Sequence, residues 1–294
     1  MILLIGNENC PYIKKIHRRI LDYHKSDCIW LTPFNLINDI LIDDSIDAST
    51  GISIRWQYKG RVITPVNVEL VINNVSYLPS DFFQDFVKED RSYAEAEFVS
   101  YFLFALSQFK NILNKPHGGS LSGWTKSLPA QWIYVSNKFP GVDTPTWALS
   151  SGKNLPQWVI DENNNNLIAN ENLFNLRYWR VRDKPLQWVQ DKDMLYYNRP
   201  AGVPIVINGV EENIFVDIDS PISSSELQDL LPINFLRDMA TNYGLSLYHA
   251  VFFFDRDKNN LTFGSILPFL HLNDKKDFQL NNSIIDYLVT DTKK

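Results

Sequence analysis

The chain has 294 residues, of which 45% are hydrophobic, 13% aromatic and 21% charged. This composition supports a large buried core, divided between two or three subdomains, and excludes a chiefly disordered chain. A formal net charge of -6 argues against a general nucleic-acid binder, since such proteins neutralise phosphates with Lys and Arg. No apolar run approaches 18 residues and the first one is too short for a signal peptide, so we expect a cytoplasmic protein without a membrane partner.

The cysteine and histidine content indicates no metal or disulfide framework. Cys10 and Cys28 are the only cysteines, and no histidine lies at metal-finger spacing from either. We therefore expect two reduced thiols. The five histidines are scattered along the sequence and give no other spacing typical of a zinc site.

The beginning of the chain has the pattern of a β-α-β unit. Residues 2–5 are continuously apolar, residues 13–21 carry apolar side chains at helical spacing, and residues 28–31 are apolar again. The segment after the first run, Gly6-Asn7-Glu8-Asn9, lacks the G-x-G-x-x-G pattern. A dinucleotide on this unit is therefore not expected.

Strands and one long helix follow. Residues 52–58 and 62–66 flank Lys59-Gly60-Arg61, which predicts a hairpin, and residues 68–75 predict a further strand. Apolar residues at helical spacing over 92–109 predict a long, mostly buried helix.

A domain boundary is expected after a short strand that proline stops. Residues 112–116 end in Pro116, and the next seven residues are rich in Gly and Ser. His117-Gly118-Gly119-Ser120 lacks the Lys-Ser/Thr of a P-loop, so we interpret it as an interdomain linker. A helix over 132–138 follows.

The last third of the chain alternates strands with helical segments. Strands are predicted over 204–208, 213–218, 245–254 and 261–267, and helical periodicity over 227–243 and in the tail after 274. The elements together predict an α/β (α+β) fold. Its parts are an N-terminal Rossmann-like domain over 1–116, a central subdomain over 117–200 and a C-terminal mixed α+β subdomain over 201–294.

The order of these elements resembles the ATP-grasp superfamily, specifically the branch of ligases that act on ribosomal peptides or amino acids. Four segments carry the resemblance: VINNVSYLP at 71–79, ILNKP at 112–116 after the helix that contains Tyr93, GVDTPTW at 141–147, and GLSLYHAVFFFDRDKNNLTFGSILP at 244–268. The resemblance implies an ATP-grasp-like fold, a peptide or amino-acid substrate, and ATP with magnesium as the cofactors of an active member.

In that family the last segment ends in a Glu-x-Asn-Pro-like motif that holds magnesium against the ATP phosphates. By resemblance, Ser265 stands at the glutamate position and Leu267 at the asparagine position, and the earlier metal aspartate falls at about Val251 or Phe252. Magnesium prefers oxygen ligands, which leucine, valine and phenylalanine side chains lack. The resemblance therefore predicts that the metal-binding motif is degenerate.

Two other groups of residues are binding candidates. The candidates for holding a phosphate or an acidic peptide are Lys115, Arg177, Arg180, Arg182, Lys184 and Arg199. Charge-rich segments are more often solvated surface. Asp255 and Asp257 are candidate relocated metal ligands, although an Asp-x-Asp pair in a polar turn ordinarily forms the turn itself.

The leading hypothesis is an ATP-grasp-like protein without efficient ATP-dependent catalysis that binds a peptide or a partner protein in a peptide-modification pathway. The first alternative is an active carboxylate-amine (peptide) ligase, in which Asp217, Asp219, Asp255 or Asp257 holds magnesium with ATP. The second alternative is a structural subunit of a hetero-oligomeric ligase. A homo- or hetero-oligomer is compatible with these hypotheses, and no nucleic-acid partner is expected.

Overall fold

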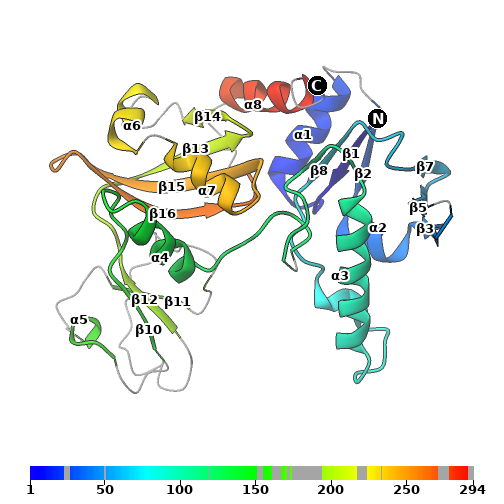
Figure 1. Cartoon of the computed structure of the whole chain (residues 1–294), viewed down its shortest axis with the longest axis horizontal. Coiled ribbons are helices and arrows are strands. Elements are labelled where there is room, and N and C mark those ends of the chain that lie inside the picture. The colour runs from blue at the N-terminus through cyan, green and yellow to red at the C-terminus, as the bar shows by residue number, and fades with distance from the viewer. Residues whose placement is uncertain are drawn as a thin grey trace.

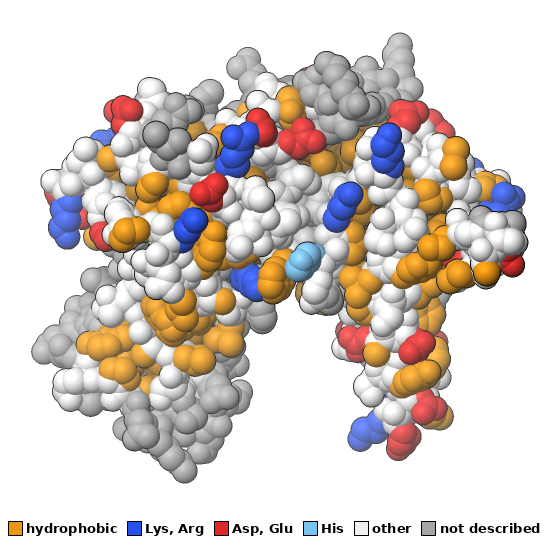
Figure 2. All heavy atoms as spheres, viewed as in Figure 1, with side chains coloured by type: hydrophobic (Ala, Val, Ile, Leu, Met, Phe, Trp, Pro, Cys, Tyr) orange, Lys and Arg blue, Asp and Glu red, His pale blue; other side chains and the backbone are white. Residues whose placement is uncertain are grey.

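The structure is a computed structural model, and it describes residues 1–22, 27–49, 51–118, 120–150, 155–160, 167–170, 173, 194–216, 224–232, 234–270 and 278–290. Figure 1 shows two halves that meet at the top of the view, with helix α3 and the strands β10, β11 and β12 pointing down on opposite sides. The space-filling view confirms that the face between these two arms is hollowed (Figure 2).

The N-terminal half is built on a parallel sheet with the order β2-β1-β8-β9. Its strands are β1 (Ile2–Ile5), β2 (Cys28–Leu31), β8 (Leu70–Asn73) and β9 (Ile112–Leu113). The helix α1 (Pro11–Asp22) connects β1 to β2, which confirms the predicted β-α-β unit. The helix α8 (Phe278–Thr290) from the end of the chain packs beside α1, and the Arg19 guanidinium binds the Asp286 carboxylate over 2.6 Å.

The rest of this half consists of short helices, α3 and a set of short strands. These elements are α2 (Pro33–Asn38), β3 (Leu41–Ile42), β4 (Ser45–Asp47), β5 (Gly51–Ser53), β6 (Trp56–Tyr58), β7 (Arg61–Ile63), the 3-10 helix η1 (Ser80–Phe83) and α3 (Arg91–Ser107). The predicted hairpin is present, because β6 and β7 pair around Lys59 and Gly60, which both adopt positive φ. The predicted strand over 52–58 is divided into β5 and β6.

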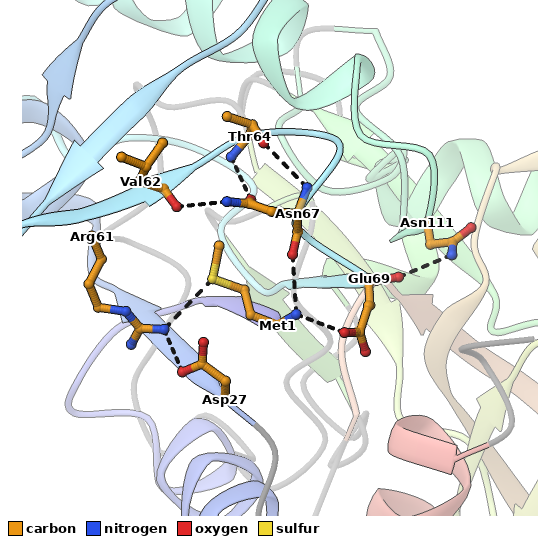
Figure 3. Close-up of polar contacts among 8 residues, drawn as sticks. All are labelled: Met1, Asp27, Arg61, Val62, Thr64, Asn67, Glu69 and Asn111. Atoms are coloured by element: carbon orange, nitrogen blue, oxygen red, sulfur yellow. Dashed lines mark hydrogen bonds and ion pairs between the residues drawn. The ribbon is translucent and has the colours of Figure 1, made fainter.

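A polar network surrounds the N-terminus of the chain (Figure 3). The amino group of Met1 donates to the carboxylate of Glu69 over 2.9 Å and to the carbonyl of Asn67 over 3.2 Å. Arg61 binds Asp27, and Asn111 Nδ2 donates to the carbonyl of Glu69 over 3.0 Å. These contacts connect the starts of the parallel strands β1, β2 and β8 to β7 and to the segment before β9.

The C-terminal sheet is antiparallel, with the order β14-β13-β15-β16. Its strands are β13 (Val203–Val210), β14 (Asn213–Val216), β15 (Leu247–Asp255) and β16 (Asn260–Leu267), and its helices are α6 (Ser224–Leu230), α7 (Phe235–Asn242) and α4 (Leu128–Lys138). Helix α7 covers one face, where the centroid of the Phe235 ring lies 5.8 Å from the ring centroids of both Phe252 and Phe263. The predicted helix over 227–243 is two helices, because Pro232 cannot continue the first one.

A small sheet with the order β10-β12-β11 forms the third part. It consists of β10 (Trp147–Ser150), β11 (Leu167–Asn170) and β12 (Met194–Asn198), with the short helix α5 (Gln157–Ile160) nearby. The division of the chain at residues 116 and 200 remains a prediction. Helix α4, although it precedes the small sheet in sequence, packs along β16, where Gln131 Oε1 accepts a bond from the Ile266 N–H over 2.8 Å.

The predicted linker at 117–120 belongs to a packed loop at the junction of the two halves. In its described residues, His117 and Ser120 exchange two backbone hydrogen bonds of 2.9 and 3.0 Å. Farther along, Ser122 Oγ donates to the carbonyl of Asn73 over 2.7 Å. The loop is therefore fixed to the end of β8. None of the helices in the described ranges is long and apolar enough to cross a membrane.

Candidate functional site

The hairpin β15–β16 carries the positions at which the resemblance places the metal ligands. Val251 lies directly opposite Ser265, and His249 lies opposite Leu267. The register then shifts between Val251 and Phe252, because Gly264 is an extra residue on β16. Alternate strand residues point to opposite faces, so Val251 and Ser265 share the face away from α7, whereas Phe252 contacts α7. Of the two candidate aspartate positions, the pairing favours Val251.

This pair is buried, and Val251 belongs to the hydrophobic core of the C-terminal half. Val251 is 3% exposed, Ser265 is fully buried and Leu267 is 7% exposed. The Ser265 hydroxyl is a buried oxygen without a hydrogen-bond partner. In the described part of the chain, no three or more His, Cys, Asp or Glu side chains are grouped as a metal site would require.

The next three residues that lie side by side on this face include two polar side chains. Asn208, His249 and Leu267 lie side by side on β13, β15 and β16, and Asn208 is 4% exposed. His249 Nδ1 lies 2.8 Å from the carbonyl of Phe269, and its ring centroid lies 4.7 Å from that of the Phe269 ring. His249 is thus a strand residue whose ring nitrogen has a hydrogen-bond partner.

The basic candidates are only partly within the described residues. Lys115 is exposed and lines a crevice of about 470 Å³ between the two halves, together with Lys110 and Ser246. Arg199 directly follows β12 and is half-buried. The other basic candidates, Arg177, Arg180, Arg182 and Lys184, lie outside the described residues, as do Asp217 and Asp219.

The two aspartates between β15 and β16 have different contacts. Asp255 Oδ1 accepts hydrogen bonds from the backbone N–H groups of Asp257 and Lys258 over 3.1 and 3.4 Å, and Oδ2 lies 3.8 Å from Lys258 Nζ. Asp257 is exposed. These are the contacts of a turn-forming aspartate.

A groove of about 420 Å³ lies on the α7 side of the sheet. Its lining is mostly apolar and comes from β14, α6, α7, the segment that joins the helices, and Tyr248: Ile214, Val216, Leu227, Leu231, Pro232, Phe235, Leu236 and Tyr248. Burial raises the pKa of Tyr248 to about 12. The sequence analysis missed this groove because it treated 227–243 as one helix, although Pro232 signals the break.

The groove also has polar and charged lining residues, namely Glu211, Glu212, Asn234 and Arg237. Arg237 forms an ion pair with Glu212. Glu211 accepts a long hydrogen bond of 3.4 Å from the Tyr287 hydroxyl and remains exposed. The arrangement can hold apolar side chains of a ligand together with a cationic group beside Glu211.

No protein-family model matches the chain, and none of the curated proteins is similar to it in sequence. Solved structures do match. The macrocyclase MdnC from Microcystis aeruginosa MRC, bound with the precursor peptide MdnA, superposes with a TM-score of 0.68 at 13% identity, covering 98% of this chain and 99% of MdnC. The ATP-grasp ligase PsnB, complexed with a minimal precursor, gives 0.71 at 11% identity, covering 100% of this chain and 99% of PsnB.

A third match is the RiPP-associated ATP-grasp ligase of Chryseobacterium gregarium, in complex with ADP and a leader and core peptide. Its TM-score is 0.63 at 12% identity, with coverage of 98% of this chain and 96% of that one. The chain therefore has the ATP-grasp fold. It shares this architecture over almost its whole length with ligases and macrocyclases of the peptide-modifying branch.

Proposed function

We propose that this protein is a cytoplasmic ATP-grasp-like pseudoenzyme that binds a peptide or a partner protein in a peptide-modification pathway. The observation that carries the proposal is the pair Val251 and Ser265, with Leu267 next to it on β16. These side chains offer one oxygen atom in a buried, apolar environment. A magnesium ion needs several oxygen ligands and retains water, so these residues do not fit the ion that an active ATP-grasp ligase uses.

Phosphoryl transfer depends mainly on positioning and on neutralising the phosphate charge with metal and cations. With a single buried oxygen atom, the residues at the family's metal positions would not hold a magnesium ion against a triphosphate. The fold itself is kept, and the relatives that share it were solved with precursor peptides. Binding of a peptide is therefore the part of the family's activity that the chain retains in this proposal.

Isothermal titration calorimetry with ATP, with and without magnesium, tests the loss of nucleotide binding. We expect no binding, or a Kd weaker than about 1 mM in both conditions. PsnB, which has been solved with AMPPNP, serves as the positive control. Magnesium-dependent binding with a Kd below about 10 µM would contradict the proposal. In that case, loss of binding in Asp255→Ala or Asp257→Ala would establish the active ligase with relocated ligands.

The groove lined by α6, α7 and β14 is the peptide-binding surface in this proposal. Ile214 lines it and is 41% exposed, so Ile214→Asp changes the surface of the groove without disturbing the core. Peptides selected from a random library on the wild-type protein are expected to bind the variant at least about tenfold more weakly, since an apolar contact is lost.

Val203→Asp provides the matched control, because Val203 is 52% exposed on the neighbouring strand and does not line the groove. Fluorescence anisotropy of the selected peptides would measure both variants. Equal binding to Ile214→Asp and wild type would remove the groove from the proposal. If the library yields no peptide that binds the wild-type protein, and the protein instead purifies as a stable hetero-oligomer with a ligase, the structural-subunit hypothesis would be favoured.

A further inference from the structure

The strand pairs β3–β6 and β4–β5 belong to two short sheets that follow one another along the same two chain segments. The pairs Leu41–Gln57, Ile42–Trp56, Ser45–Ser53, Ile46–Ile52 and Asp47–Gly51 fit a single register. Among the strands of the described residues, only β6 has a further neighbour, β7, so no described strand pairs with the outer part of these segments. We call the described residues 41–49 and 51–55 the ribbon, and it lies at the margin of the N-terminal half, away from the hollow between the arms (Figure 1).

One face of the ribbon is an apolar stripe that begins in the core. Trp56 is fully buried, and its Nε1 donates to the Tyr101 hydroxyl over 2.6 Å. Farther out on the same face, Ile42 is 44% exposed, and the facing pair Ile46 and Ile52 is 74% and 49% exposed. The stripe therefore continues the N-terminal core into solvent as a mainly aliphatic surface, interrupted by Asp44, which lies on the same face between Ile42 and Ile46 and accepts a bond from the Tyr101 hydroxyl.

The free edge of the ribbon is open to another strand. The Asp43 N–H donates to the carbonyl of Arg55 over 2.9 Å, and the Arg55 N–H donates to Asp44 Oδ1 over 2.6 Å, so Asp43 and Arg55 form one bond of a hydrogen-bonded pair. In an antiparallel ladder the residues on either side of such a pair direct their N–H and C=O groups outward. The backbone groups of Ile42 and Ile46 thus face away from the partner strand. An extended segment can add to an edge of this kind.

The charge of the ribbon selects the occupant. The ribbon contains three aspartates, Asp43, Asp44 and Asp47, and one cationic residue, Arg55, so it is acidic overall. Asp44 accepts a bond from the Tyr101 hydroxyl, and Asp43 forms only an exposed ion pair with Arg55 at 3.5 Å. Like charges facing each other across strands are destabilising, so the ribbon of a second copy is a poor partner.

We propose that the ribbon is a docking edge for an extended segment of a partner protein or peptide in which aliphatic residues alternate with Lys or Arg. The aliphatic side chains pack on Ile42, Ile46 and Ile52. The cations lie on the opposite face, next to Asp43 and Asp47. This surface is separate from the groove on the C-terminal sheet, so it stands or fails independently of the proposed function.

The probe is a labelled ten-residue peptide in which valine and lysine alternate, measured by fluorescence anisotropy against the full chain. The wild-type protein is expected to bind it, and a peptide with glutamate in place of lysine is expected not to bind. The double variant Ile46→Ser/Ile52→Ser should weaken binding by about tenfold or more, since the apolar contact is lost. Val66→Ser is the matched control, because Val66 is 96% exposed outside the ribbon, and it should bind as the wild type does.

Circular dichroism would establish that both variants are folded, as expected for substitutions at exposed positions. Failure of the wild-type protein to bind the probe would overturn the proposal. So would equal binding by the double variant, or equal binding of the glutamate peptide. A wild-type dimer in sedimentation that the double variant dissociates would assign the ribbon to a second copy and overturn it as well.

Discussion

Asn114→Ala is expected to lower the free energy of unfolding by about 3–5 kcal/mol, measured by urea denaturation. Asn114 is fully buried between the two halves. Its Nδ2 donates to the carbonyls of Leu247 and Pro268 over 2.6 and 2.9 Å, and its Oδ1 accepts from the N–H groups of Ser246 and Leu247 over 2.9 and 2.8 Å. Alanine would leave these four backbone groups without their partner in a site that water does not reach.

The backbone adds to this cost. Asn114 has a φ of 56°, a left-handed conformation that asparagine tolerates better than alanine. Asn111→Ala is the control, because Asn111 donates only one exposed bond, of 3.0 Å, to Glu69. Its effect should stay below about 1 kcal/mol. Equal losses in the two variants would show that the amide of Asn114 does not join the halves.

The local elements were predictable because their signals are local. The β-α-β unit at the N-terminus and the turn at Lys59 and Gly60 depend on residues a few positions apart, and both are present. The order of the elements also identified the ATP-grasp fold, which the structural matches confirm.

The junction between the two halves, the ribbon and the groove were not predictable from local signals. Asn114 acts on residues more than a hundred positions away, and a sequence pattern gives no information on such pairs. The ribbon has one register across two interrupted strands, which alternation alone did not indicate. The groove depends on the break at Pro232, which the continuous helical periodicity of the flanking residues concealed.

The candidate metal positions show where sequence reasoning stops. The sequence left Val251 and Phe252 as equivalent candidates, because a one-residue slip moves a side chain to the other face of a strand. The pairing favours Val251, which lies opposite Ser265, whereas Phe252 packs under α7; the assignment remains a prediction. The expected loss of magnesium binding is also still a prediction, and the calorimetric titration tests it.

Trp132→Ala is expected to lower the free energy of unfolding by about 3–5 kcal/mol and to loosen the small sheet. Trp132 is fully buried on α4, its Nε1 donates to the carbonyl of Gly264 over 2.7 Å, and its ring lies 6.1 Å from that of Trp147 and 5.4 Å from that of Tyr197. It therefore connects the bulged edge of the C-terminal sheet to both β10 and β12. Trp132→Phe keeps most of the apolar volume but lacks the N–H donor. Its free energy of unfolding should therefore fall by only about 1–2 kcal/mol. Hydrogen exchange should rise in β10 and β12 of the alanine variant well before it rises in the N-terminal sheet; a uniform rise along the chain would contradict this role for Trp132.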